Sequence, residues 1–327
     1  MKFKALRIHL EPELIRSIEV IDETYLPDND VLIEVHYSSL NYKDALSASG
    51  NKGVSKNYPH TPGIDAAGVV IESKSLKWKA GDRVIVTGYD LGMNTFGGFS
   101  EYICVPSEWI VKCPDQLDLR DAMCYGTAGF TAALSVEQIV NNVSPDAGEI
   151  LVTGATGGVG SVAIAILAKL GYKVVGASGK PQYEGFLKGI GAERMILRDE
   201  IDDHSGKPLL RPNWAGVIDT VGGNILATAL KSTQYQGHVT CCGNVANHEF
   251  TTSVYPFILK GITLHGIDSV MCDAVKREEI WGLIADKWYI EGFSNAVLEI
   301  GFDEVIDQIN LILSGKHLGR TIVNPRK

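Results

Sequence analysis

One segment constrains this chain most: a short apolar run, a glycine-rich turn, an apolar helix and a second apolar run. It reads EILVTGATGGVGSVAIAILAKLGYKVVGAS over residues 149–178. The periodicity changes from that of a strand to that of a helix and back, which predicts one βαβ unit. Further candidate strands and helices alternate up to residue 266. The sequence therefore predicts a doubly wound parallel sheet with helices on both faces, the Rossmann arrangement.

Residues 1–125 have a different character, because short β-type runs are separated by turn signals that are rich in Gly, Asn and Asp. The runs are Ala5–Leu10, Val31–Tyr37, Gly68–Glu72, Arg83–Thr87 and Phe99–Val105. Many short strands between many turns predict a small barrel. The last part of the chain has two amphipathic stretches and a final strand over residues 319–324, and we expect it to pack on the barrel. We thus predict an α/β protein with a barrel domain over residues 1–125, followed by the domain of the parallel sheet.

The glycine-rich turn has the context of a dinucleotide-binding fingerprint, because it follows a strand, opens a helix and precedes a second strand. We expect residues 156–159 (Thr156, Gly157, Gly158 and Val159) to form the cofactor-binding turn. Gly157 would let the backbone approach a pyrophosphate, and Gly160 would let the helix pack tightly on the strand. Ala155 stands where the fingerprint usually has its first glycine, which indicates a slightly different turn. A glycine turn of some other α/β protein is the alternative.

The end of the second strand indicates which dinucleotide binds. An NAD-binding protein usually has Asp or Glu there, where it bonds the ribose 2′-hydroxyl. This chain has Ser178, Gly179 and Lys180, and Arg198 lies just beyond the next strand. A hydroxyl and cations suit a 2′-phosphate, so the sequence predicts NADPH as the cofactor. Solvated surface positions are the alternative for Lys180 and Arg198.

Composition excludes several classes of protein. The formal net charge of −9 argues against a general nucleic-acid binder. No apolar run reaches the roughly 18–20 residues that a membrane helix needs, and the N-terminus alternates like a strand rather than like a signal peptide. The six cysteines are scattered without a CxxC pair, and the histidines lack ligand spacing. We therefore predict a cytoplasmic protein with reduced thiols and no structural metal site.

Several longer strings together resemble the medium-chain dehydrogenase/reductase superfamily along nearly the whole chain. They are PGIDAAGVV at 62–70, KAGDRV at 79–84, GGFSEY at 97–102, ATGGVG at 155–160 and GKHLGRTIV at 315–323. Within it, SSLNYKDAL at 38–46, GTAGFTAAL at 126–134, IDTVGG at 218–223 and PFILKGITLHGIDSV at 256–270 are similar to the acrylyl-CoA reductase (YhdH/AcuI-type) branch, a zinc-independent branch often labelled quinone oxidoreductase. The resemblance implies a GroES-like catalytic barrel over residues 1–125, completed by residues 265–327, with a Rossmann NADP-binding domain over residues 126–264. It also implies an active site in the cleft between them and a homodimer or higher homo-oligomer.

The chain departs from the zinc alcohol dehydrogenases of this superfamily at both ligand positions. They carry a Cys ligand where this chain reads Leu40-Asn41-Tyr42-Lys43-Asp44, and a His-Glu pair where it reads Gly63-Ile64-Asp65. Without a Lewis acid, alkoxide oxidation loses its main electrostatic aid. Reduction of a C=C bond conjugated to a carbonyl needs only hydride transfer and hydrogen bonds to a developing enolate, so we expect that reaction.

The resemblance places Tyr42, Asn41 and Arg320 at the active site. We expect Tyr42 to contact the nicotinamide or to donate its hydroxyl to the substrate, Asn41 to bond cofactor or substrate, and Arg320 to point into the cleft. A core tyrosine, a turn-capping asparagine and a surface arginine are the alternatives, and no proton donor can be named. Asp44 and Asp65 are expected to organise the barrel rather than to exchange protons.

The predicted activity is NADPH-dependent reduction of a 2-enoyl thioester, acrylyl-CoA to propanoyl-CoA, a small-molecule substrate. The first alternative is a quinone or enone reductase, and a basic patch for CoA phosphates would separate the two. Lys43, Lys52 and Lys56 lie on or near a loop that could supply one. The alternative from a different class is a non-catalytic NADPH-binding protein.

Overall fold

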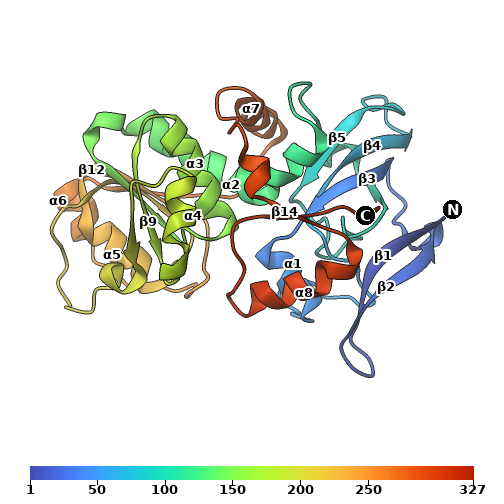
Figure 1. Ribbon diagram of the computed structural model, residues 1–327, viewed down its shortest axis with the longest axis horizontal. Coiled ribbons are helices and arrows are strands. Elements are labelled where there is room, and N and C mark those ends of the chain that lie inside the picture. Colours follow the sequence, from blue (N-terminus) through green and yellow to red (C-terminus); the bar gives the residue numbers. More distant parts are fainter. The chain divides into compact units, whose positions relative to one another are not determined.

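The computed structural model describes residues 1–327, and the chain divides into two compact units. Unit 1 comprises residues 1–127, 269–287 and 291–327, and unit 2 comprises residues 128–268 and 288–290. The sequence analysis placed the boundaries at 125/126 and 264/265. The chain thus leaves unit 1 after residue 127, forms most of unit 2 and returns at residue 269, as the colours along the ribbon in Figure 1 show, and residues 288–290 make a second, short visit to unit 2.

Unit 2 contains a six-stranded parallel sheet with the strand order β10-β9-β8-β11-β12-β13. Its strands are β8 (Glu149–Thr153), β9 (Lys173–Ser178), β10 (Arg194–Leu197), β11 (Trp214–Asp219), β12 (Thr233–Cys241) and β13 (Thr263–Gly266). The strand order reverses between β8 and β11: the chain continues from β8 toward one edge of the sheet and from β11 toward the other. That reversal is the switch point at which doubly wound sheets bind their ligands.

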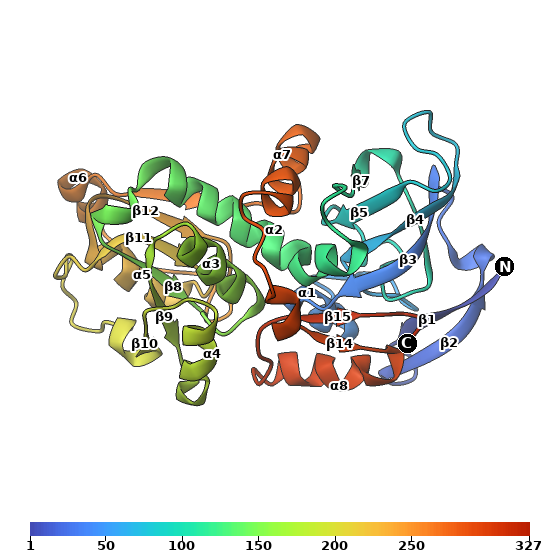
Figure 2. The ribbon, with the colours of Figure 1, turned by 45° about the horizontal axis from the view of Figure 1, so that its top comes forward.

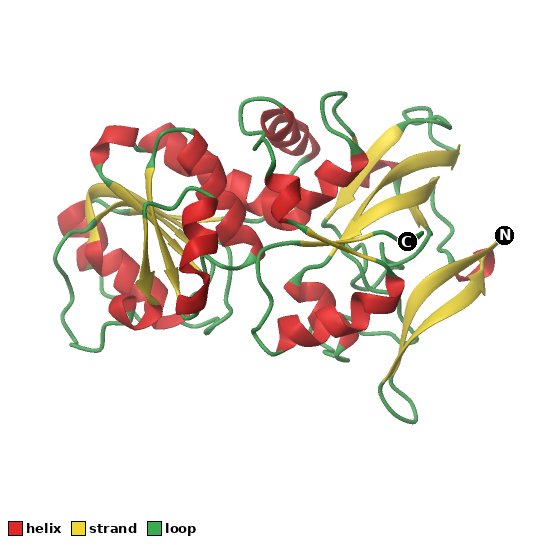
Figure 3. Cartoon of the chain, viewed as in Figure 1, coloured by secondary structure: helices red, strands yellow, loops and turns green.

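Helices cover both faces of this sheet (Figures 2 and 3). They are α3 (Gly158–Lys169), α4 (Glu184–Gly189), α5 (Gly223–Ser232), α6 (Tyr255–Lys260) and the later part of α2 (Leu119–Asn142). Val175 of β9 belongs to the same apolar cluster as Leu230 of α5. Its neighbour Gly176 faces Ile164 of α3 and Leu187 of α4. Because successive strand residues face opposite sides, α5 lies on one face and α3 and α4 on the other, which confirms the predicted Rossmann sheet.

Unit 1 contains a seven-stranded sheet and a separate hairpin. The strands of the sheet follow the order β14-β15-β3-β4-β5-β7, with β6 also pairing with β3, and β1 pairs with β2 in the hairpin. The strands are β1 (Lys2–His9), β2 (Ile15–Asp22), β3 (Val31–Ser39), β4 (Asp65–Ser73), β5 (Arg83–Thr87), β6 (Tyr102–Val105), β7 (Ile110–Lys112), β14 (Leu298–Ile300) and β15 (Thr321–Val323). Since β15 pairs with β3 and β14 pairs with β15, the C-terminal segment adds two strands to the sheet of unit 1.

Three further helices belong to unit 1: α1 (Tyr42–Ala48), α7 (Ala274–Ala285) and α8 (Phe302–Leu313). Ala45 of α1 and Ile309 of α8 lie in one buried cluster with Leu40. The sequence analysis did not predict α1, because only seven residues form the helix and three of the first four are polar or aromatic. It also left out β2, whose alternation is weak since most of its residues are only half-buried.

Helix α2 connects the two units and is broken at Gly126, which has φ 54° and ψ −157°. This conformation is open to glycine and strained for other residues. None of the helices combines the length and the apolar character that crossing a bilayer requires.

Candidate active site

The glycine-rich turn of unit 2 lies at the carboxyl end of β8, beside the switch point. Gly157 caps α3, and the helix proper begins at Gly158. A Cβ atom on Gly160 would lie 2.5 Å from the carbonyl oxygen of Gly154, so only glycine fits. The predicted tight contact between helix and strand is therefore present. The first amides of an α-helix have no intrahelical partners, so the start of α3 is the kind of place where a phosphate group can bind.

Hydroxyl groups and cations gather at the end of β9. The hydroxyl oxygens of Thr156 and Ser178 lie 3.1 Å apart, and the Lys180 amide donates to Ser178 Oγ at 3.2 Å. Arg198 packs over the backbone here, because a Cβ on Gly179 would lie 3.0 Å from a guanidinium nitrogen. Burial lowers the pKa of Lys180, and the positive charge of Arg198 lowers it further. Two cations held this close fit an anion between them, so the donor set suits the 2′-phosphate of NADP(H).

Asp219, at the end of β11, is a residue of this region that the sequence analysis gave no role. It is fully buried, and burial raises its pKa. Its carboxylate accepts from Thr153 Oγ1 at 2.7 Å and from the Gly222 amide at 2.8 Å. Asp219 thereby joins the ends of β8 and β11 at the switch point. Its position after an apolar run, in IDTVGG, was the sequence signal that could have identified it.

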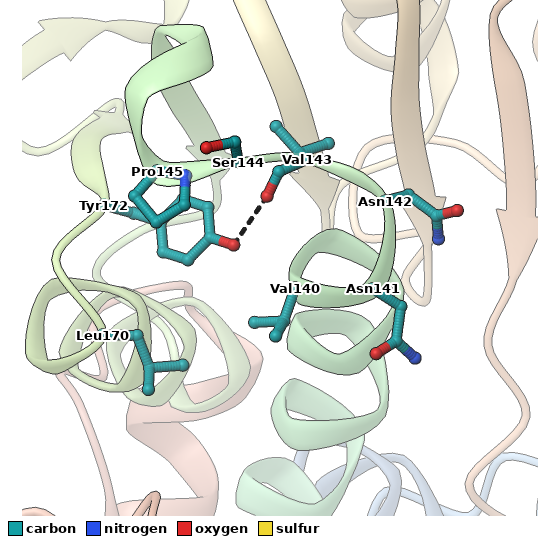
Figure 4. Close-up of a pocket in the computed structure, with 8 residues that line it drawn as sticks. All are labelled: Val140, Asn141, Asn142, Val143, Ser144, Pro145, Leu170 and Tyr172. Carbon is teal, nitrogen blue, oxygen red and sulfur yellow. Dashed lines mark hydrogen bonds between the residues drawn. The ribbon is translucent and has the colours of Figure 1, made fainter.

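An open pocket of about 490 Å³ in unit 2 lies elsewhere (Figure 4). It is lined by the ends of α2 and α3 and by Tyr172, whose hydroxyl donates to the Val143 carbonyl at 2.7 Å. These segments precede β8 and β9, so the pocket is at the amino end of the sheet. Since ligands of doubly wound sheets bind at the carboxyl end, this pocket is not the cofactor site.

In unit 1 a buried hydrogen-bond network centres on the Asp65 carboxylate. It accepts from Asn41 Nδ2 at 2.8 Å and from the Thr127 amide at 2.8 Å, and also from the hydroxyls of Ser39 and Thr127. Four donors satisfy a carboxylate that is fully removed from solvent. The network joins β3, β4 and the α2 break, where a Cβ on Gly126 would lie 2.4 Å from Ser39 Oγ.

Arg320 lies inside this network and not on an open surface, since only 2% of the residue is exposed. Its side chain donates to Ser39 Oγ at 2.8 Å, to the Cys124 carbonyl at 3.1 Å and to Asn41 Oδ1 at 3.3 Å. It also donates to the carbonyls of two further residues, Leu40 and Met123. These five bonds match the five N–H groups of a guanidinium. The expectation that Arg320 points into an open cleft is thus corrected, because internal acceptors occupy the whole group.

Asp44 fixes the start of α1. Its carboxylate accepts from the amides of Asn41 at 2.8 Å, Gly63 at 3.1 Å and Ile64 at 2.8 Å. Burial, followed by the nearby charge of Asp65, raises the pKa of Asp44 to about 7. The two aspartates share one buried cation, Arg320, so their charges are only partly balanced. The structure agrees with the organising role expected for both.

Tyr42 is the exposed member of the predicted set, with 44% of the residue open to solvent. It is the first residue of α1, directly after Asn41, whose amide group is engaged at both ends, by Asp65 and by Arg320. The unit 1 residues thus divide into a buried network and one exposed phenol beside it. The structure brings Asn41 and Arg320 together and leaves Tyr42 able to meet a ligand.

The side chains at the two positions where zinc alcohol dehydrogenases have their metal ligands do not fit a zinc ion. An amide, Asn41, and a carboxylate, Asp65, stand there and bond each other, and neither a thiolate nor an imidazole is among their partners. No group of three or more His, Cys, Asp or Glu side chains in residues 1–327 has the geometry of a metal site. We derive no step through a metal.

Two family models match the chain, the alcohol dehydrogenase GroES-like domain over residues 27–115 and the zinc-binding dehydrogenase domain over residues 158–285. The first falls in unit 1, and most of the second falls in unit 2. The zinc in the second description does not correspond to ligands in this chain, as the donor set above shows.

Individual relatives match over nearly the full length. The "Probable acrylyl-CoA reductase AcuI" of Escherichia coli is 42% identical over 94% of both chains. YhfP of Bacillus subtilis, whose name includes the term quinone oxidoreductase, is 42% identical over 94% of this chain and 93% of its own. The YhdH oxidoreductase of Salmonella enterica, solved in complex with NADP, is 40% identical, with a TM-score of 0.95 over 98% of this chain and 99% of its own. The chain therefore belongs to the medium-chain dehydrogenase/reductase superfamily, in the group that contains the AcuI and YhdH proteins.

Proposed function

We propose that this protein is an NADPH-dependent oxidoreductase that reduces the C=C bond of a 2-enoyl thioester, acrylyl-CoA to propanoyl-CoA. The observation that carries the proposal is the bonded Asn41–Asp65 pair, which stands where a zinc dehydrogenase has metal ligands and provides neither a thiolate nor an imidazole for a Lewis acid. Enoyl reduction needs donors for a developing enolate and no Lewis acid. The names and the bound nucleotide of the relatives agree with this reaction.

The cofactor site follows from unit 2. Residues 156–159 would hold the pyrophosphate at the start of α3, and Ser178, Lys180 and Arg198 would hold the 2′-phosphate, with Gly179 giving the guanidinium room. Bound NADPH would supply the hydride to the β-carbon, and the α-carbon would then take a proton from water or a side chain. The protein's own contribution here is to orient the nucleotide by charge-assisted hydrogen bonds, which are stronger than neutral ones.

The reacting end of the substrate is assigned to Tyr42, which would donate its hydroxyl to the thioester oxygen as charge develops there. Asn41 and Arg320 act as positioning residues, because their polar groups are committed to the Asp65 network that sets the start of α1. If the Tyr42 hydroxyl instead orients the nicotinamide, its removal changes the KM for the cofactor rather than kcat.

Steady-state oxidation of NADPH with acrylyl-CoA, measured beside a simple quinone, tests the proposal. We expect the thioester to give the higher kcat/KM. Fast reduction of the quinone with no turnover of acrylyl-CoA would favour the second candidate, a quinone or enone reductase, which the name of YhfP supports. No oxidation of NADPH with either class, despite tight binding of NADPH, would favour a non-catalytic binding protein.

We also infer a homodimer, formed through unit 2, in the cytoplasm. Strand β13 pairs only with β12, so its other edge has free backbone groups. On α6 nearby, Ile258 is 67% exposed, and Leu259 and Tyr255 are also exposed. An open strand edge beside apolar side chains is the kind of surface that a second copy covers. Light scattering should give twice the monomer mass, and Ile258→Glu should shift the protein toward monomer. A wild-type monomer at micromolar concentration would contradict this.

A further inference from the structure

The loop that follows α1 carries positive charge in a stretch without acidic residues. Residues 45–64 contain Lys52 and Lys56 but no Asp or Glu, although the whole sequence contains 39 of these. Both lysines are exposed. The loop belongs to unit 1, as does Tyr42 at the other end of α1. Its local charge is thus opposite to the net charge of the protein, −9.

The Lys52 ammonium is held in place rather than left to move freely. It donates to the Lys56 carbonyl at 3.1 Å and lies 4.9 Å from the centre of the Tyr58 ring. The Tyr58 hydroxyl in turn donates to the Ser47 carbonyl at 2.7 Å, which fixes the ring to α1. One of the three N–H donors of Lys52 is used, so two remain for a ligand. A cation that is already ordered loses less entropy when it binds an anion.

A second loop, residues 90–94, contacts the backbone of Lys56. The Lys56 amide donates to Asn94 Oδ1 at 3.3 Å, and the Asn94 amide group donates to Asp90 Oδ1 at 2.9 Å. The Asp90 carboxylate therefore bonds the asparagine, and neither Lys52 nor Lys56 forms an ion pair with a carboxylate in residues 1–327. The two ammonium groups are available to an external anion.

Helix α1 separates Tyr42 from the lysine loop along the chain. Helix α1 has seven residues, so it is about 10 Å long at about 1.5 Å per residue. Tyr42 begins the helix, and the lysine loop follows its end. In a CoA thioester the pantetheine arm separates the reacting carbons from the pyrophosphate and the 3′-phosphate. A substrate with its double bond at Tyr42 can thus place its phosphates at this loop.

We propose that Lys52 and Lys56 bind the phosphates of the CoA part of the substrate and so select CoA thioesters over shorter ones. This inference rests on the proposed function, since Tyr42 must mark the reacting end. Lysine binds phosphate as a point charge, which suits a flexible substrate that enters and leaves in every turnover.

The test compares acrylyl-CoA with acrylyl-pantetheine, which has the same reacting group without the phosphates. The ratio of the two kcat/KM values is measured for the wild type, for Lys52→Ala, for Lys56→Ala and for the double variant. Lys207→Ala, an exposed lysine of unit 2, is the matched control. We expect the ratio to fall roughly tenfold in the double variant, the effect of losing two exposed charge contacts, and to stay at the wild-type value in the control. Added salt should lower the wild-type ratio more than that of the double variant.

A double variant that keeps the wild-type ratio would overturn the inference. Equal loss with both thioesters would also overturn it, because the loop would then shape the pocket rather than bind phosphate. If the wild type reduces neither thioester, the proposed function fails instead. Calorimetric titration of the wild type and the double variant with free CoA then decides the role of the lysines separately: equal affinity would refute it, and weaker binding by the double variant would support it.

Discussion

Lys180→Ala should weaken the binding of NADPH and leave that of NADH nearly unchanged. Lys180 follows Gly179 in the chain, the Arg198 guanidinium packs over Gly179, and the positive charge of Arg198 disfavours that of Lys180 in the absence of an anion. A 2′-phosphate relieves this repulsion and accepts hydrogen bonds from both. NADH has only a hydroxyl there, so it gains little from either cation. The variant thus separates the phosphate contact from all others that the two nucleotides share.

The magnitude follows from the surroundings of the ammonium. A hydrogen bond to a charged group contributes about 1.5–3 kcal/mol. Lys180 is half-buried, so solvent screens it in part, and we take the lower end. A loss of about 1.4 kcal/mol raises the Kd for NADPH roughly tenfold. Arg198 remains in the variant, so some preference for NADPH should persist until Arg198→Ala is added.

Titrations that follow nucleotide fluorescence give the Kd values of both cofactors for the wild type and each variant. Lys207→Ala is again the control for loss of one positive charge from unit 2. The effect at Lys180 should shrink as salt is added, because ions screen an exposed charge contact. Equal Kd values for NADPH and NADH in the wild type would refute the reasoning. So would an equal loss of both affinities in Lys180→Ala, since a misshapen turn affects the two nucleotides alike.

Three further predictions concern unit 1. Tyr42→Phe should lower kcat and kcat/KM for acrylyl-CoA together, by up to ~10²-fold, while thermal unfolding stays unchanged because the side chain is exposed; wild-type rates would show that the hydroxyl has no catalytic role. Gly126→Ala should lower the free energy of unfolding by about 1–3 kcal/mol through its positive φ alone, and by more because a Cβ meets Ser39 Oγ at 2.4 Å; a melting temperature equal to the wild type would contradict the network geometry. The pKa of Asp44 is about 7 in the folded protein and about 3.9 in an unfolded chain. Between these pH values the folded state binds one more proton than the unfolded state. The free energy of unfolding should therefore fall as pH rises from about 4 to about 7. Asp44→Asn, measured by denaturant unfolding at pH 5 and pH 8, should flatten that fall at the cost of the bond from the Asn41 amide, and an unchanged slope would assign the pH dependence to other groups.

The fold of unit 2 and its candidate cofactor residues could be predicted from the sequence because most of these residues lie close together along the chain. The βαβ unit, the turn at residues 156–159 and the Ser178–Lys180 segment all lie within residues 149–180. Helix and strand periods therefore suffice to place them. Arg198 was the harder case, since it comes from the next strand, and the structure does bring it to Gly179.

The barrel site could be predicted only as a set of residues, not as an arrangement. Ser39, Asp65, Thr127 and Arg320 come from segments up to about 280 positions apart, as the 281-residue separation of the Arg320–Ser39 bond shows. No periodicity records such a contact. The sequence also could not show that Arg320 is internal, because an arginine before a short strand is usually exposed. Burial of the guanidinium became visible only when the Cys124, Leu40 and Met123 carbonyls were found around it.

The buried charges of unit 1 hold in place the segment that leads into α1. Two carboxylates and one guanidinium are removed from water, and such groups generally cost stability relative to apolar side chains of the same size. Their hydrogen bonds converge on the segment that leads into α1: Asp44 holds the Asn41 amide, while Asp65 and Arg320 hold the two ends of the Asn41 side chain. The backbone amide of Asn41 and both ends of its side-chain amide are thereby held. Tyr42 follows Asn41 directly, so the start of its helix is held as well. A zinc dehydrogenase would fix its reacting atoms by coordination at these positions. Here the same rigidity comes from a saturated hydrogen-bond network, and it leaves the exposed phenol of Tyr42 as the group that can meet the substrate.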